Sequence, residues 1–130
     1  MEEKNIFQKI IDGEIPATKV YEDDKFLAFL DIMPVFYGHT LLIPKDHYKW
    51  MQDAPDELIS EIFIKTKGLM KAIKKGLDCD FVQIGIVGDE VPHFHIHLIP
   101  RYHDQKDTGR KKYEGTEQMK EFAEKIKKAL

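Results

Sequence analysis

Between His93 and Leu98 histidines and apolar residues alternate without interruption. Successive side chains of a β-strand point to opposite faces, so this period of two predicts a strand with three imidazoles on one face and three apolar groups on the other. The apolar face anchors the strand in a sheet, because it has to pack against another layer of the protein. The imidazole face is then the natural place for chemistry.

The other segments predict an α+β domain. Apolar spacing predicts a short helix over residues 6–12, a long amphipathic helix from Asp53 or Pro55 to about Gly76, and a C-terminal helix around residues 119–126. Short apolar or aromatic runs predict five strands, over residues 19–22, 25–31, 39–44, 81–87 and 93–101. We expect a single domain over residues 1–130, in which about five strands form an antiparallel sheet and the long helix packs on one face, with short helices at the two ends.

Composition excludes several classes of function. The chain has 130 residues and a formal net charge of -3, so it offers no basic face for nucleic acid. It has no apolar segment of about 20 residues and no apolar signal core, so we expect neither membrane insertion nor export. The single cysteine, Cys79, cannot form an internal disulfide. These features predict a cytoplasmic protein.

Two kinds of chemistry fit the row of imidazoles. Neutral imidazoles two residues apart on a strand can converge on one zinc ion about 2.0–2.1 Å from each nitrogen. Alternatively, one imidazole can attack phosphorus and form a covalent phosphoramidate, while its neighbours donate hydrogen bonds to the phosphate oxygens. A lone histidine in a strand is usually an ordinary hydrogen-bonded residue. Half of the chain's 6 histidines in one register favour a functional role.

Several segments in the right order resemble the histidine triad (HIT) family, in its nucleotide-binding (Hint-like) branch. The family motif is His-x-His-x-His followed by two apolar residues, and the run from His93 to Ile99 matches it at every position. Residues 31–34 (Asp-Ile-Met-Pro) and 38–47 (Gly-His-Thr-Leu-Leu-Ile-Pro-Lys-Asp-His) match two further family segments. The resemblance covers about residues 5–103 and implies a HIT-like fold, leaving residues 104–130 as a C-terminal loop and helix.

The resemblance also implies an activity. It makes His95 the nucleophile on the α-phosphorus of a nucleotide, with His97 on the phosphate and His93 and His39 completing the imidazole network. The implied intermediate is a nucleotidyl-histidine that water hydrolyses, and no cofactor is needed. The implied ligands are purine nucleotides or nucleoside phosphoramidates, derivatives of AMP or GMP.

Further residues take binding roles by the same resemblance. Asp31 would accept hydrogen bonds from the ribose hydroxyls and Ile32 would lie beside the base, while the backbone of Gly88 could approach the phosphate. Family members commonly have Gly-Gln-Ser or Gly-Gln-Thr where this chain has Gly88-Asp89-Glu90, so the resemblance places Asp89 and Glu90 at the nucleotide as well. An ionised Glu90 can only accept hydrogen bonds and repels a polyphosphate, which favours an amine as the leaving group.

The resemblance bears on metal binding and assembly as well. Many bacterial members begin with a Cys-x-x-Cys pair that joins two histidines in a structural zinc site, and Asn5 and Gln8 occupy those positions here. We therefore expect no metal. Family members usually pair through the long helix and a central strand, which suggests a homodimer.

Three alternatives to the phosphoramidase remain open. The chain could be a purine nucleotide-binding module with vestigial turnover that acts through a protein partner, and Glu90 is the main support for this. It could hydrolyse dinucleoside polyphosphates. It could also bind a metal ion with the same imidazoles.

Overall fold

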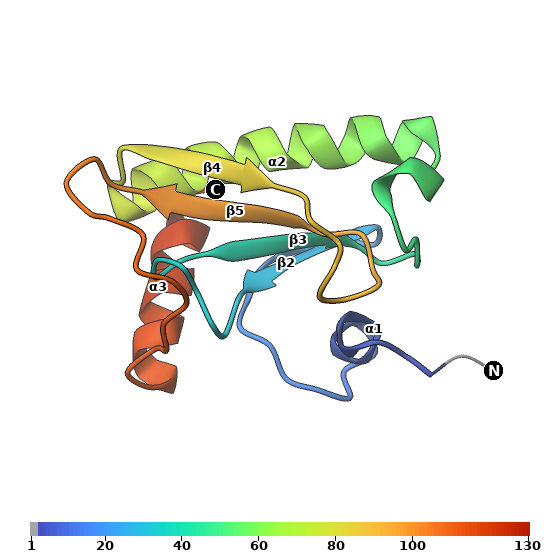
Figure 1. The fold of residues 1–130 in the computed structure, drawn as a ribbon, viewed down its shortest axis with the longest axis horizontal. Helices are drawn as coiled ribbons and strands as arrows, with labels where there is room; N and C mark the ends of the chain where they lie inside the picture. Colours follow the sequence, from blue (N-terminus) through green and yellow to red (C-terminus); the bar gives the residue numbers. More distant parts are fainter. Residues whose placement is uncertain (1–2) are drawn as a thin grey trace.

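The computed structural model describes residues 3–130 and confirms the α+β class. Its five strands form one antiparallel sheet in the order β1-β2-β3-β5-β4, with the long helix α2 on one side (Figure 1). The elements are α1 (Ile6–Ile11), β1 (Lys19–Glu22), β2 (Phe26–Leu30), β3 (Thr40–Pro44), the short 3₁₀ helix η1 (Met51–Asp53), α2 (Asp56–Leu77), β4 (Phe81–Gly85), β5 (Ile96–Arg101) and α3 (Thr116–Ala129).

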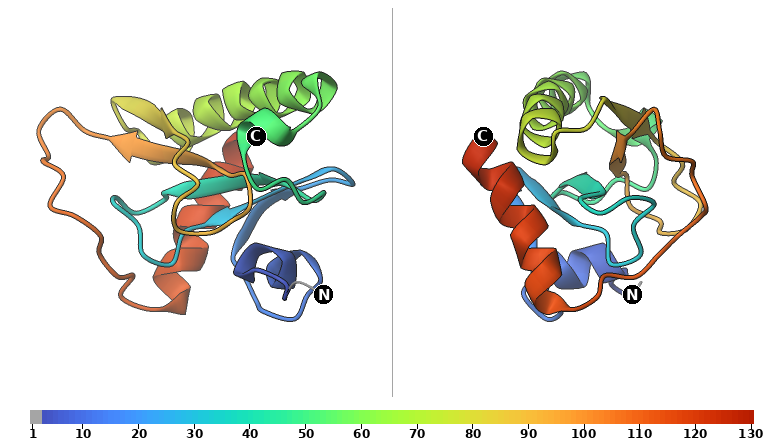
Figure 2. Two further views of the ribbon diagram at one scale, coloured as in Figure 1. Left: turned by 45° about the vertical axis from the view of Figure 1, so that its right-hand side comes forward. Right: turned by 90° about the vertical axis from the view of Figure 1, so that its left-hand side faces the viewer.

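The sheet is buried on both faces in its centre. Every residue of β2 and β3 is buried, and alternate side chains enter two separate clusters. Ala28 and Leu42 pack with α2 and α3, whereas Phe29 and Leu41 pack with Phe7 of α1. Helix α1 thus covers the face opposite α2 (Figures 1 and 2). This arrangement places α1 over the part of the sheet that carries the histidines.

The two strands nearest the histidine run are shorter than the sequence predicts. Strand β5 was expected to begin at His93, but it begins at Ile96, because its pairing with β3 ends where Leu42 faces Ile96. Pro44 has no N–H group with which to continue the ladder, and its carbonyl instead accepts a hydrogen bond from the His93 side chain at 2.9 Å. Strand β4 ends at Gly85 instead of Val87. The histidines therefore straddle the start of β5.

The C-terminal part of the chain wraps around the domain. Residues 102–115 have no regular secondary structure, as the sequence predicts, and they run along the outside before α3 packs against α2 and β1 (Figure 2). The backbone N–H of Lys111 donates to the carbonyl of Pro34 at 2.9 Å, and the Tyr113 hydroxyl accepts from the N–H of Gly38 at 2.9 Å. These bonds hold the segment against the loop that follows β2. Within residues 3–130, no helix is both long and apolar enough to cross a membrane.

Candidate active site

A pocket of about 200 Å³ lies between α1 and the sheet. Its wall is mostly apolar, with side chains from α1, β2 and β3, and its polar groups gather at one end. The apolar lining includes Ile6, Phe7, Ile10, Phe29, Leu41 and Val91, and the polar end is formed by Asp31, Glu90, His95 and His97.

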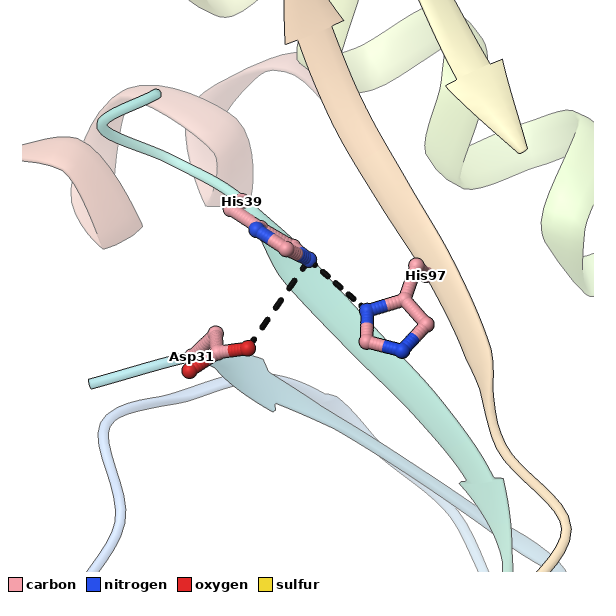
Figure 3. A group of neighbouring side chains, drawn as sticks. All are labelled: Asp31, His39 and His97. Carbon is pink, nitrogen blue, oxygen red and sulfur yellow. Dashed lines mark hydrogen bonds and ion pairs between the residues drawn. The ribbon is translucent and has the colours of Figure 1, made fainter. Parts of the chain in front are cut away.

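A chain of hydrogen bonds fixes the proton positions on two histidines. The backbone N–H of Val35 donates to Nδ1 of His39 at 3.1 Å, so the proton of the neutral His39 ring is on Nε2. That Nε2 lies 2.9 Å from Nδ1 of His97, which must accept (Figure 3). The proton of His97 is therefore on Nε2, where it can be donated to a ligand in the pocket.

A second chain fixes His93 and His95. Nε2 of His93 donates to the carbonyl of Pro44, so its Nδ1 is free to accept the hydrogen bond of the Asn5 amide at 3.3 Å. Nδ1 of His95 lies 2.7 Å from the carbonyl oxygen of His93 and must be the protonated nitrogen. Nε2 of His95 therefore keeps its lone pair, as a nucleophile requires. The ring of Phe7 packs edge-on against His95, with the centroids 5.0 Å apart.

Burial keeps the rings of His39, His93 and His97 uncharged. It lowers the pKa of His39 to about 3, although Asp31 opposes the shift, and it also lowers the pKa of His93 and of His97. Nearby imidazoles add to the lowering, His97 for His39 and His95 for His97. At neutral pH His39, His93 and His97 are consequently neutral rings whose tautomers are set by hydrogen bonds.

One group of side chains is close enough together to hold a metal ion. It consists of Asp31, His39 and His97, and one ligand atom from each lies within 4.8 Å of the others. The nitrogen that His39 turns toward the other two is the one that carries its proton, so it cannot coordinate without a change of tautomer. Asp31 Oδ2 already accepts a hydrogen bond from Arg110. The geometry thus fits a hydrogen-bonded network better than a metal centre.

Asp31 is paired with an arginine that the sequence analysis did not identify. Asp31 Oδ1 accepts the backbone N–H of Met33 at 2.9 Å, and Oδ2 accepts from Nη1 of Arg110 at 2.8 Å. The same Nη1 donates to the carbonyl of Met33 at 2.7 Å. Nη2 of Arg110 lies 3.8 Å from Glu90 Oε1. Arg110 thus links the two carboxylates that line the pocket.

Of the other predicted site residues, Ile32 lies at the pocket, whereas Gly88 and Asp89 do not line it. Ile32 lines the pocket and is 69% exposed, so it is free to contact a ligand. Gly88 and Asp89 are not among the pocket-lining residues. Gly88 has φ +78° and packs on Trp50, because a Cβ on it would lie 2.8 Å from the indole ring. The binding roles of Gly88 and Asp89 stay predictions.

Two further histidines lie away from the nucleophile. His47 donates from Nε2 to the carbonyl of Pro92 at 2.8 Å and packs against the His93 ring, at a centroid distance of 5.1 Å. His103 packs on Phe81 at 5.5 Å. Neither His47 nor His103 is among the residues that line the pocket.

Asn5 could have been recognised from sequence. Its side chain accepts the N–H of Gln8, and the Gln8 side chain accepts the N–H of Asn5, each at 2.8 Å, which is a capping box at the start of α1. An Asn followed three residues later by Gln signals this arrangement. The second role of Asn5, on His93, joins residues 88 positions apart and has no local signal.

Comparison with known proteins agrees with this geometry. The sequence model of the HIT domain family matches residues 12–104. An uncharacterized HIT-like protein of Methanocaldococcus jannaschii is 46% identical over 102 residues, which are 75% of this chain and 78% of that protein. An adenosine 5′-monophosphoramidase of Saccharomyces cerevisiae is 43% identical over 97 residues, which are 74% of this chain and 61% of that enzyme.

A solved structure extends the likeness to the whole fold. The crystal structure of a HIT-like protein from Bartonella henselae, described as involved in cell-cycle regulation, superimposes with a TM-score of 0.93 at 37% identity and covers 100% of this chain and 98% of that one. A sheet with a buried row of histidines beside a pocket defines the histidine triad class of proteins. This chain belongs to the HIT domain family.

Proposed function

We propose that the protein is a hydrolase of nucleoside 5′-phosphoramidates and related nucleoside monophosphate derivatives, with His95 as its nucleophile. The observation that carries this proposal is the free lone pair on Nε2 of His95, fixed by the 2.7 Å bond from Nδ1–H to the His93 carbonyl. This histidine is only 3% exposed and lines the pocket. The similarity to an enzyme named as an adenosine 5′-monophosphoramidase supports the same reaction.

The hydrogen bonds suggest how the reaction proceeds. Nε2 of His95 attacks the α-phosphorus, the phosphorus–nitrogen bond breaks with its electron pair on nitrogen, and the departing amine takes a proton from solvent. The positive charge that develops on His95 is stabilised by the carbonyl of His93, and Nε2–H of His97 donates to a phosphate oxygen. Water then attacks phosphorus and loses a proton to solvent, the bond between phosphorus and Nε2 breaks with its electron pair on His95, and a nucleoside monophosphate leaves.

The shape of the pocket supports a nucleoside as the bound part of the substrate. Its apolar wall, formed by α1 and the sheet, suits the faces of a purine, and Ile32 stands exposed at its edge. Asp31 offers carboxylate oxygens to the ribose hydroxyls at the polar end. We assign adenine and guanine nucleotides to this pocket without distinguishing them.

The charges at the pocket favour an amine as the leaving group. Asp31 and Glu90 line the pocket, and of residues 3–130 no lysine or arginine does so. A departing amine gains a positive charge when it is protonated, and it is attracted by Glu90, whose contact with Arg110 is the longer of the two at 3.8 Å. A dinucleoside polyphosphate would instead bring further negative charge toward Glu90, which disfavours that substrate class.

The first experiment follows the covalent intermediate. The protein is mixed with adenosine 5′-phosphoramidate, quenched without acid, and measured by intact-protein mass spectrometry, beside His95→Ala and in the presence or absence of a chelator. We expect a transient adduct of one adenylyl group and released amine from the native protein, no adduct from His95→Ala, and no effect of the chelator.

Each other result has a defined meaning. Saturable AMP binding without adduct or released amine would replace the enzyme proposal with the nucleotide-binding module. Activity that disappears with the chelator would favour a metal ion on the histidines. An adduct that persists in His95→Ala would place the nucleophile on another residue.

We also propose that the protein acts as a homodimer in the cytoplasm. Strand β4 lies at the edge of the sheet, and Phe81 on it is 45% exposed. Ile64 on the neighbouring helix α2 is 70% exposed. Exposed apolar side chains beside an unpaired strand edge favour pairing with a second copy.

A further inference from the structure

We propose that Arg110 is a specificity-determining residue that makes the pocket accept a nucleotide in preference to an uncharged nucleoside. It does so by offsetting part of the negative charge that the carboxylates of Asp31 and Glu90 bring to the pocket. This inference rests on the proposed binding of nucleotides in the pocket, but it does not require that the protein hydrolyse them.

The charged side chains that line the pocket oppose the binding of a nucleotide. An α-phosphate is an anion, and the charged side chains that line the pocket are the carboxylates of Asp31 and Glu90. His39 and His97 beside them lack compensating charge, since burial lowers the pKa of both rings. A pocket with these groups alone would repel its ligand.

Arg110 supplies a positive charge beside these carboxylates. Arg110 is the only arginine or lysine of residues 3–130 that forms an ion pair with a pocket-lining carboxylate. Nη1 contacts Asp31 at 2.8 Å and Nη2 faces Glu90 at 3.8 Å. The side chains of Arg110 and Asp31 are 34% and 15% exposed, so water screens this pair only partly.

Hydrogen bonds to neighbouring backbone groups hold Arg110 in position. The Arg110 side chain is held by its bond to the carbonyl of Met33, and the next residue, Lys111, bonds through its backbone to Pro34. The guanidinium is therefore positioned before any ligand arrives. An arginine stays protonated over the whole working pH range, so this compensation is permanent.

The test compares the binding of AMP and of adenosine by isothermal titration calorimetry. Neither ligand has a phosphorus–nitrogen bond to cleave, so the titration measures binding without turnover. Native protein should bind AMP more tightly than adenosine. In Arg110→Met we expect AMP affinity to fall about tenfold, and adenosine affinity by less than about threefold. The loss for AMP should shrink in about 1 M salt, where the screening length is about 3 Å.

Three further variants distinguish an effect of the Arg110 charge from an effect of the shape of its side chain. Lys111→Met removes the same charge from the neighbouring residue, whose ammonium lies 4.7 Å from the centre of the Phe36 ring, and should leave both affinities unchanged. Arg110→Lys should retain most of the preference for AMP. Adding Glu90→Gln to Arg110→Met should restore part of the AMP affinity, because it removes one of the carboxylates whose charge Arg110 had partly offset.

Other results overturn the inference. An equal loss of AMP and adenosine affinity in Arg110→Met would mean that the arginine only shapes the pocket. A loss of AMP affinity that salt does not change would mean the same. An equal loss of AMP affinity in Lys111→Met, or native protein that binds AMP and adenosine equally tightly, would also contradict the inference. A protein that prefers AMP to adenosine but does not hydrolyse the phosphoramidate would contradict the proposed hydrolase activity and would still support the role of Arg110.

Discussion

At the scale of single residues, His39 ties the stability of the protein to pH. Burial lowers the pKa of His39 to about 3, and the pKa of His93 and of His97 also lies below the usual 6.5. Below about pH 6.5 the unfolded chain therefore binds more protons than the folded chain, and the free energy of unfolding decreases. Each such histidine adds a slope of up to about 1.4 kcal/mol per pH unit.

We predict that the free energy of unfolding is nearly constant above about pH 7 and declines from about pH 6.5 to pH 5. Urea titrations at fixed protein concentration measure it. His39→Gln cannot titrate but keeps an N–H donor for His97, so its slope should be shallower by up to about 1.4 kcal/mol per pH unit. It should also be about 1–3 kcal/mol less stable at pH 7.5, because the N–H of Val35 loses its acceptor. Equal slopes in both proteins would contradict the assignment.

The residues of the candidate site differ in how far the sequence reveals them. The row of His93, His95 and His97 stands out because its spacing is local, and Asp31 and His39 follow from the family resemblance. Arg110 does not, because its bond to Asp31 spans 79 residues and its own neighbourhood is an ordinary polar loop. Contacts that depend on how a loop folds back have no local pattern in the sequence.

At the scale of elements, the packing of α3 against α2 depends on Gly76. A Cβ on Gly76 would lie 2.4 Å from the carbonyl oxygen of Lys125 and 2.9 Å from its carbonyl carbon. These are backbone atoms, so the contact cannot be relieved by rotating a side chain. Gly68 lies in the same helix, and a Cβ there would meet nothing within 4 Å.

Two alanine variants form a matched pair that tests this packing. Gly68→Ala should stabilise the protein by up to about 1 kcal/mol, because alanine favours the helix over glycine. Gly76→Ala should lose that gain and destabilise by about 1–3 kcal/mol, since α2 and α3 must move apart. Thermal unfolding followed by circular dichroism measures both. Stabilisation by Gly76→Ala would show that α3 does not pack closely on α2.

Element positions are easier to predict than element ends. The helical spacing in α2 and the apolar runs of β2 and β3 placed these elements correctly, because each pattern lies within one segment. The predicted start of β5 was wrong by three residues, since it depends on where β3 stops pairing with β5, which is at Leu42. The position of α1 over the histidines could not be predicted either, because its six residues do not indicate which part of the sheet the helix packs against.

At the scale of the whole molecule, the unpaired edge of β4 and the exposed apolar face of α2 bear on assembly. Ile64 is 70% exposed, so replacing it does not disturb the core of one copy. If α2 packs against α2 of a second copy, Ile64→Glu buries a charge and removes apolar burial worth about 2 kcal/mol. We predict that it raises the dimer dissociation constant at least about tenfold.

Sedimentation velocity over a range of protein concentrations measures this change. Ile32→Glu is the matched control, because Ile32 is equally exposed, at 69%, but lies at the pocket on the side of the sheet covered by α1. It should leave the dimer intact. A native protein that sediments as a monomer at all concentrations would exclude the dimer. If Ile64→Glu and Ile32→Glu weakened the dimer equally, the interface would lie elsewhere. Because each copy carries its own His95, Asp31 and Arg110, a monomeric Ile64→Glu that still binds AMP would show that the pocket is complete within one chain.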